Sequence, residues 1–334
     1  MFRTLLKLVA LGMVLVLGGA GVGIMKVQDF LHRAPSTEHD ERIVEIPSGA
    51  TARKVAELLY AEGVITQTRA FYYLARWRGV AGNIRAGEFR FYTDQLPDEV
   101  LETLVHGEEV TYRISIPEGY RIQEMKRVVE SVGFLNGATF EAITRDPEMC
   151  RKLGVQAPTL EGFLFPDTYL VTRRMSEEKL VEGMVRRFQQ VWTPEFEGRA
   201  REIGMTQLQV VTLASIVEKE TGVPEERPLI GSVFHNRLKL GMKLESDPTI
   251  IYGLPNYDGD IRSRDIRSPH PWNTYVIPGL PPSPIASPGE EAIRAVLWPA
   301  ESKYLFFVSR NNRTHDFSET YAQHAALVEQ LRRR

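Results

Sequence analysis

The stretch TQLQVVTLASIVEKETG, residues 206–222, decides the fold of the larger part of this chain. It predicts a single helix, because Thr206 followed three residues later by Gln209 is a capping box that satisfies backbone N–H groups at a helix start. Gly222 favours the conformation that ends helices, and Pro224 prevents the helix from continuing. The middle of the stretch, LQVVTLASIV, is apolar on nearly every face, which is typical of a buried helix.

Two glutamates stand at the end of this helix. Glu218 lies on the same face of the helix as small and apolar side chains. It also lies in the last turn, where the helix dipole disfavours an anion. Burial and the dipole both raise a carboxyl pKa, and a carboxyl group that is still protonated near neutral pH can act as a general acid. Glu220 has a similar claim, so spacing alone leaves the choice open. The alternative is that both form ion pairs, with Arg227, Lys219 or Arg237 as partners.

The N-terminus differs from the rest of the chain. The 334 residues carry a formal net charge of −2 and are 43% hydrophobic, which fits about two domains and excludes the basic excess of nucleic-acid-binding proteins. Residues 8–25 form an uncharged run of membrane-spanning length, and the basic residues before it place residues 1–7 in the cytoplasm. A cleaved signal peptide is the alternative, because GGAG offers small residues near the end of the run. The run is longer than a usual signal-peptide core, so an uncleaved single-pass anchor in the cytoplasmic (inner) membrane is expected.

A weak internal repeat follows a polar, patternless stretch at 26–41 that we interpret as a linker. VEIPSGATARKVAELLYAEGVI from Val44 resembles ISIPEGYRIQEMKRVVESVGFL from Ile114. Each copy predicts a short strand, a Pro-x-Gly turn and an amphipathic helix closed by glycine. The first copy continues with a strand at 88–92 and a helix at 97–105. The repeat therefore indicates two small α+β modules, or one module and its echo at the start of the next domain.

Aromatic residues in the first module offer stacking faces for sugar rings. Each one taken singly is more often a core residue, so the two interpretations stay open. The residues are Tyr72, Tyr73, Trp77, Phe89, Phe91 and Tyr92.

The middle of the chain predicts helices around an irregular stretch. Residues 158–171, PTLEGFLFPDTYLV, combine glycine, proline and acids with aromatics, which fits the wall of a groove better than a regular element. Helices are expected at 176–191 and 228–241, on either side of the 206–222 helix. Residues 243–254, KLESDPTIIYGL, are expected to form a strand and a loop.

Residues 268–289, SPHPWNTYVIPGLPPSPIASPG, contain seven prolines among twenty-two residues. Proline at that density fixes an extended backbone. A floppy linker is one interpretation, but Trp272, Asn273 and Tyr275 favour a rigid loop that lines a cleft, because linkers rarely contain large aromatics. Beyond it we expect a helix at 292–300, a buried strand at 303–309 and a helix at 318–331.

Six motifs within residues 158–324 resemble, in content and order, those of the MltG-type (YceG-like) endolytic murein transglycosylases. They are LEGFLFPDTY from Leu160, LASIVEKETG from Leu213, LIGSVFHNRL from Leu229, LESDPTIIYGL from Leu244, WNTYVIPGLPPSPIASPG from Trp272 and YLFFVSRNNRTHDFSETY from Tyr304. The predicted anchor and the IPxG module agree with that family. The resemblance implies an α+β fold with an N-terminal transmembrane helix, a LysM-like, glycan-binding subdomain at 42–112 and a mixed α+β catalytic domain at 113–334.

The resemblance also implies site residues. The glutamate of the family's IVEKE motif is the catalytic acid/base, which corresponds to Glu218 here. Other motif residues line the cleft in the family and are expected to contact sugar: Glu161, Ser246, Asp247, Thr249, Asn273 and Tyr275. For Asp247, capping of a turn or helix next to Pro248 is an equal alternative. The family needs neither a metal nor an organic cofactor, and the histidines at 235, 270 and 315 lack tight ligand spacing.

Two positions depart from the family pattern. Trp272 stands where tyrosine is commoner, and NNRT replaces the glycine-rich turn before His315. Both are expected to alter the lip of the groove rather than the chemistry.

The implied function is internal cleavage of MurNAc–GlcNAc bonds in nascent peptidoglycan strands, which leaves 1,6-anhydro-MurNAc ends and terminates glycan polymerisation. The implied partners are glycan strands and peptidoglycan synthases, at the outer face of the cytoplasmic membrane. One alternative is an inactive, membrane-anchored scaffold that binds peptidoglycan. A pyridoxal-phosphate aminodeoxychorismate lyase, an old label of the family, is disfavoured by the anchor and by the lack of a suitable lysine context.

Overall fold

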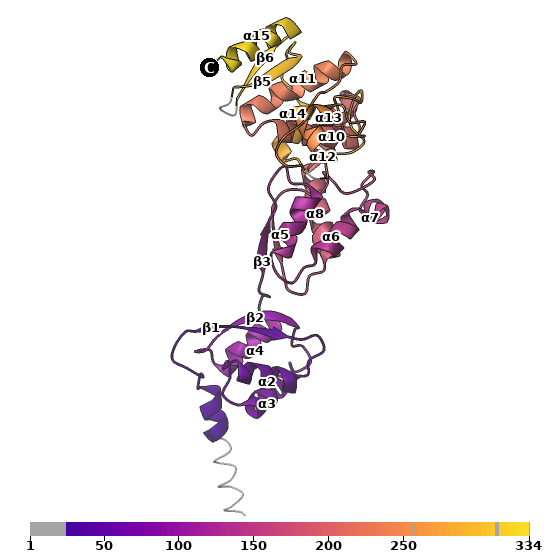
Figure 1. The fold of residues 1–334 in the computed structure, drawn as a ribbon. Helices are drawn as coiled ribbons and strands as arrows, with labels where there is room; N and C mark the ends of the chain where they lie inside the picture. The colour runs from indigo at the N-terminus through magenta and orange to yellow at the C-terminus, as the bar shows by residue number, and fades with distance from the viewer. Residues whose placement is uncertain (1–24, 256, 311–313, 334) are drawn as a thin grey trace, which may run out of the picture. The chain divides into compact units, whose positions relative to one another are not determined.

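The computed structural model describes residues 25–255, 257–310 and 314–333 (Figure 1). Within these ranges, none of the helices combines the length and the apolar character needed to cross a bilayer. The predicted anchor at 8–25 lies outside the described residues except for Met25. The chain divides into two compact units, one reaching Tyr112 and including Thr172–Arg174, the other formed by Arg113–Val171 and Met175–Arg334. The mixed α+β class is confirmed: the described part is mostly helical, with small two-stranded sheets.

The first unit places helices against one small sheet. Strand β1 pairs antiparallel with β2, with Val44 opposite Phe89. The apolar faces of the strands and helices enclose a core that contains Val44, Leu59, Phe71 and Phe89. Phe30 joins this core, so the stretch at 26–41 that we interpreted as a linker is partly packed on the unit. The elements are β1 (Glu41–Ile46), α2 (Ala52–Ala61), α3 (Thr68–Trp77), β2 (Gly87–Tyr92) and α4 (Pro97–His106).

The internal repeat is confirmed as a repeat of structure. In each copy a strand, β1 or β3 (Tyr112–Ser115), leads through a Pro-x-Gly turn into a helix, α2 or α5 (Ile122–Glu130). Gly49 and Gly119 occupy equivalent positions in the two turns and share a φ of 75°. Only glycine adopts that conformation at little cost, which explains why both copies carry it.

The second unit is larger and mostly helical. Strand β3 pairs with β4, and β5 pairs antiparallel with β6, with Phe306 opposite Ser318. Besides β3 and α5, its elements are α6 (Gly137–Thr144), α7 (Pro147–Lys152), β4 (Thr168–Val171), α8 (Glu177–Val191), α9 (Pro194–Glu202), α10 (Gln207–Glu220), the 3₁₀ helix η1 (Pro224–Glu226), α11 (Arg227–Lys239), α12 (Asp247–Gly253), α13 (Ser263–Ile266), α14 (Glu290–Leu297), β5 (Phe306–Ser309), β6 (His315–Ser318) and α15 (Tyr321–Arg332).

Helix α10 is the centre of this unit. Every residue from Val210 to Val217 is buried, and α9, α11, α12 and α14 all pack against this helix. Figure 1 shows α10 among α11, α12 and α14. Its start is the predicted capping box: the Gln209 N–H donates to the Thr206 hydroxyl (3.2 Å), and the Thr206 N–H donates to the Gln209 side chain (2.8 Å). The prediction of a buried helix is therefore confirmed.

The predicted ending of α10 is wrong in detail. The helix stops at Glu220, and Thr221 is already extended, with a φ of −141°. Gly222 does not take up a positive φ. Instead the Val223 N–H donates to the Thr221 hydroxyl (3.0 Å), so a threonine-based turn redirects the chain toward the helix that starts at Pro224.

Two other predictions in this unit need correction. The stretch 243–254 contains helix α12 rather than a strand, because Asp247-Pro248 starts a helix more strongly than Ile250-Ile251-Tyr252 favours a strand. The strand predicted at 303–309 is shorter, Phe306–Ser309, and only half-buried. The helices expected at 176–191, 228–241, 292–300 and 318–331 are present as α8, α11, α14 and α15 with small shifts at their ends.

Gly162 allows the irregular segment 158–171 to approach α10. Its φ is 85°, and a Cβ there would lie 2.4 Å from Cβ of Pro284 and 3.1 Å from Cγ1 of Val211. The irregular segment, the proline-rich loop and α10 meet at this point.

Replacing Gly162 by alanine should destabilise the second unit by about 2–4 kcal/mol, since the methyl group meets both backbone strain and overpacking. The matched control is Gly183→Ala in α8, where no atom lies within 4 Å of a Cβ. That change should be neutral or stabilise by up to about 1 kcal/mol. Urea unfolding measures both, and equal effects of the two substitutions would contradict this account of Gly162.

Candidate active site

Glu218 lies at the C-terminal end of α10 with its carboxyl group turned into the protein. Its side chain is 6% exposed, and that of its partner Arg227, at the start of α11, is 9% exposed. Nη2 of Arg227 donates to Oε1 of Glu218 (3.0 Å), and the backbone N–H of Gly289 donates to Oε2 (3.1 Å). Both carboxyl oxygens are therefore held, one by a donor nine residues away and the other by a donor 71 residues away.

A second carboxyl group shares the same cation. Nη2 of Arg227 also donates to Oε2 of Glu118 (3.3 Å). Glu118 belongs to the turn after β3, and its side chain is 47% exposed. One guanidinium nitrogen thus lies between an inner carboxyl group and an outer one.

The surroundings raise the pKa of Glu218 above that of an ordinary glutamate. Burial is the largest cause, and the charge of Glu118 acts in the same direction. Arg227 and the Gly289 N–H act in the opposite direction but do not outweigh them. The ion pair with Arg227, considered above as an alternative to an acid role, is present together with the raised pKa, so the two are compatible.

Glu220 faces a different part of the unit. The hydroxyl of Ser246 donates a short hydrogen bond to its carboxyl group, and burial raises the pKa of Glu220 to about 7. A cavity of about 660 Å³ opens beside it, lined also by Asp247 and Tyr275. The Tyr275 hydroxyl donates to Oδ1 of Asp247 (2.7 Å). Three of the predicted sugar-contact residues, Ser246, Asp247 and Tyr275, therefore gather around Glu220.

Glu161 belongs to a third group of residues, separate from those around Glu218 and Glu220. It is buried, accepts from the Ile122 N–H (3.1 Å) and the Tyr252 hydroxyl (3.2 Å), and burial raises its pKa to about 7. Together with Tyr252 and Trp272 it lines a cavity of about 290 Å³. Because Ile122 is the first residue of α5, Glu161 also fixes the start of that helix.

Thr249 and Asn273 are bonded inside the protein. The Thr249 hydroxyl donates to the Ser246 carbonyl (2.6 Å), and Nδ2 of Asn273 donates to the carbonyls of Asp265, Ile266 and Ser268. Both side chains hold the loops around Glu220, and their role as sugar contacts stays a prediction.

Neither Glu118 nor Gly289 is among the site residues predicted from the sequence. One signal was present for Glu118: the equivalent position in the first copy of the repeat is Ser48, so only the second turn carries an acid. The histidines have other partners. His235 bonds to the Val296 carbonyl (2.8 Å), and Nδ1 of His315 bonds to Glu226 (2.7 Å). In the described part of the chain no three His, Cys, Asp or Glu residues form a group suited to a metal ion.

Of the two departures from the family pattern, the structure describes Trp272 but not most of the NNRT turn. Trp272 packs against Tyr252, with ring centroids 5.5 Å apart, at the cavity beside Glu161. Residues 311–313 of the NNRT turn lie outside the described residues.

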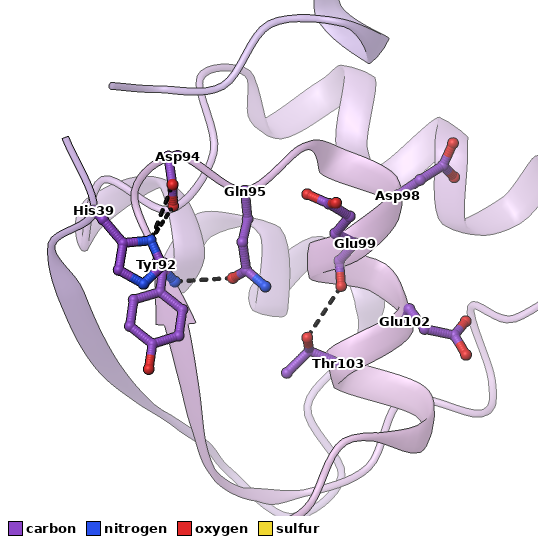
Figure 2. Close-up of a pocket in the computed structure, with 8 residues that line it drawn as sticks. All are labelled: His39, Tyr92, Asp94, Gln95, Asp98, Glu99, Glu102 and Thr103. Carbon is purple, nitrogen blue, oxygen red and sulfur yellow. Dashed lines mark hydrogen bonds and ion pairs between the residues drawn. The ribbon is translucent and has the colours of Figure 1, made fainter. Parts of the chain in front are cut away.

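The aromatics of the first unit fall into two groups. Phe89 and Phe91 are fully buried, whereas Tyr73 and Trp77 are 64% and 74% exposed. Figure 2 shows Tyr92 in a shallow pocket, where its ring stacks on His39 with centroids 4.0 Å apart. The core interpretation holds for the two phenylalanines, whereas Tyr73 and Trp77 are exposed and Tyr92 has one face of its ring covered by His39.

The carboxyl of Glu220 should make stability depend on pH. Its pKa is raised from 4.5 to about 7, so the folded state binds the proton more tightly than the unfolded chain. The free energy of unfolding should therefore fall as the pH rises through that interval. Glu220→Gln should make the fall shallower, and the raised pKa values of Glu161 and Glu218 should contribute to the fall that remains. The control Glu202→Gln, at an exposed position, should keep the wild-type slope. Urea unfolding between pH 4.5 and 8 measures the slopes, and an unchanged slope in Glu220→Gln contradicts the assignment.

Three known proteins are similar to this chain over most of its length. An endolytic murein transglycosylase of Bacillus subtilis is 28% identical over 84% of this chain and 82% of its own length. A second, from Streptococcus pneumoniae, is 26% identical over 88% of this chain, which spans 59% of that longer protein. The crystal structure of a yceG-like protein from Listeria monocytogenes superposes with a TM-score of 0.60 at 28% identity, covering 86% of this chain and 98% of that one. The YceG-like family matches residues 44–330, so the chain belongs to the YceG-like family, as its motifs predicted.

Proposed function

We propose that this protein is an endolytic murein transglycosylase that cleaves MurNAc–GlcNAc bonds within glycan strands. The observation that carries the proposal is the buried carboxyl group of Glu218, held by Arg227 and Gly289 with its pKa raised, at the end of the central helix. Relatives that carry the name endolytic murein transglycosylase support the substrate class.

The first step uses the protonated form of Glu218. Its proton passes to the glycosidic oxygen, which leaves as the 4-hydroxyl of GlcNAc while the bond from that oxygen to C1 of MurNAc breaks. Positive charge develops at C1 as the carboxylate forms. Arg227 and the Gly289 N–H already contact the carboxyl oxygens, so the new anion is stabilised without rearrangement.

The second step returns the proton. The C6 hydroxyl oxygen of the same MurNAc attacks C1, and its proton passes to the Glu218 carboxylate. The product is a 1,6-anhydro ring, no water is consumed, and the enzyme recovers its starting form. Because the substrate supplies its own nucleophile at high effective concentration, one carboxyl group replaces the pair that a glycoside hydrolase needs.

The other sites extend the proposal. Ser246, Asp247 and Tyr275 beside Glu220, and Glu161 beside Trp272, are the proposed sugar contacts, and Thr249 and Asn273 support the loops that carry them. Residues 42–112, within the first unit, are the proposed LysM-like, glycan-binding subdomain, with the exposed rings of Tyr73 and Trp77 and the pocket at Tyr92 as proposed sugar contacts. An N-terminal anchor would hold the enzyme at the outer face of the cytoplasmic membrane, beside the synthases whose strands it terminates.

Replacing Glu218 by glutamine should lower the release of anhydro-ended products from purified peptidoglycan by about 10²–10⁴-fold, the usual contribution of a general acid. Glu202→Gln, a surface change in the same unit, is the matched control and should retain activity. Mass spectrometry of the products and thermal unfolding of both variants provide the measurements.

Three results would change the proposal. Reducing ends in place of anhydro ends would make the protein a hydrolase. Full activity in Glu218→Gln would remove this residue from the mechanism. Binding of glycan without cleavage by the wild-type chain would favour the inactive scaffold.

A further inference from the structure

We propose that Glu118 is a positioning residue of this active site, which acts through the shared Arg227 to keep Glu218 in its proton-donating form. The inference rests on the proposed function and adds a residue to it.

Arg227 divides its interaction between two carboxyl groups. The same nitrogen, Nη2, lies 3.0 Å from Oε1 of Glu218 and 3.3 Å from Oε2 of Glu118. If Arg227 contacted only Glu218, the buried cation would strongly favour the ionised form of Glu218. Glu218 would then be a poor proton donor. A second carboxylate, 3.3 Å from the same nitrogen, offsets part of that attraction.

The turn that carries Glu118 is fixed from two directions. The Gly119 N–H donates to the Ser287 carbonyl (2.8 Å), and the Ser287 N–H donates to the Tyr120 carbonyl (2.9 Å), which ties the turn to the proline-rich loop. From α10, Nζ of Lys219 donates to the Gly119 carbonyl (3.2 Å). Glu118 is therefore held in place although its side chain is partly exposed.

Gly289 provides the room for this arrangement. A Cβ at Gly289 would lie 1.9 Å from Oε1 of Glu118. The backbone does not require glycine there, because φ is −74°, which any residue adopts. Glycine is a common N-cap residue, and here it also leaves space for the Glu118 carboxyl group and donates its N–H to Glu218.

The internal repeat shows that the turn itself needs no acid. Ser48 occupies the equivalent position in the first unit, before Gly49, whose φ equals that of Gly119. The same turn forms with serine, so the carboxyl group of Glu118 serves its surroundings rather than the backbone.

The charges around Glu218 set the direction of the effect. Arg227 faces it from α11, Glu118 from the turn after β3, the Gly289 N–H from the start of α14, and Lys219 follows it on α10 with its ammonium drawn to the Gly119 carbonyl. Glu118 raises the pKa of Glu218 and Arg227 lowers it. Without the charge of Glu118, Arg227 would act on Glu218 alone, and the pKa of Glu218 would fall.

Glu118→Gln in the detergent-solubilised full chain tests the inference through the pH dependence of kcat/KM for anhydro-product release. Activity requires protonated Glu218, so it declines as the pH rises through the pKa of that residue. The variant should move this alkaline limb to lower pH by roughly one unit, and lower kcat/KM roughly tenfold above the limb. The matched control is Glu290→Gln, which removes an acid of the same 47% exposure next to Gly289 and should leave the limb in place.

Gly289→Ala is the second variant, because its methyl group should displace the Glu118 carboxyl group and reproduce the same shift with Glu118 still present. It decides the matter if Glu118→Gln does not fold. An unmoved limb in the folded variants, with or without lower activity, overturns the inference. If the limb is unmoved while Glu218→Gln is inactive, only the role of Glu118 fails. If Glu218→Gln is active, the proposed function itself fails.

Discussion

Burial of the Glu218 carboxyl group is the constraint on which the rest of the second unit depends. An ionised carboxyl group removed from water costs several kcal/mol unless donors compensate for the lost hydration. Here the donors come from the start of α11 and the start of α14, and an outer carboxyl group comes from the turn after β3. All of them converge on the last turn of one apolar helix, where the helix dipole also disfavours an anion. The arrangement keeps the acid form accessible and still supplies partners for the anion.

The same helix carries two carboxyl groups with different surroundings. Glu218 has a cation and a backbone donor, whereas Glu220, two residues later and so on another face, has a serine hydroxyl and a large cavity. Pairs of titratable groups whose environments differ in this way commonly divide an active site into separate roles. In the proposed mechanism Glu218 transfers the proton, and Glu220 bonds to Ser246 at the start of α12, beside Asp247 and its partner Tyr275 from the proline-rich loop.

The sequence predicted the features that are local. The capping box at Thr206, the apolar run of α10 and the glycine turns of the repeat depend on residues close together, and the structure contains all of them. Spacing could not choose between Glu218 and Glu220, because both lie on buried faces, and the choice came from the family motifs. Arg227, nine residues after Glu218, was among the ion-pair partners that the sequence suggested. Gly289 and Glu118 could not be predicted, because Gly289 is 71 residues from Glu218 and Glu118 is 109 residues from Arg227, so they meet only through the tertiary fold. The strand expected near Asp247 failed because helix-start signals outweighed a short β-favouring run.

The central claim is that one carboxyl group acts twice and that the substrate closes its own ring. Digestion of peptidoglycan by the wild-type protein in water enriched in ¹⁸O tests this most directly, because hydrolysis and ring closure differ in the source of the oxygen that ends on C1. The account predicts new MurNAc ends that contain no ¹⁸O and have the mass of the anhydro sugar. Ends that carry one ¹⁸O atom and the mass of the reducing sugar would contradict it.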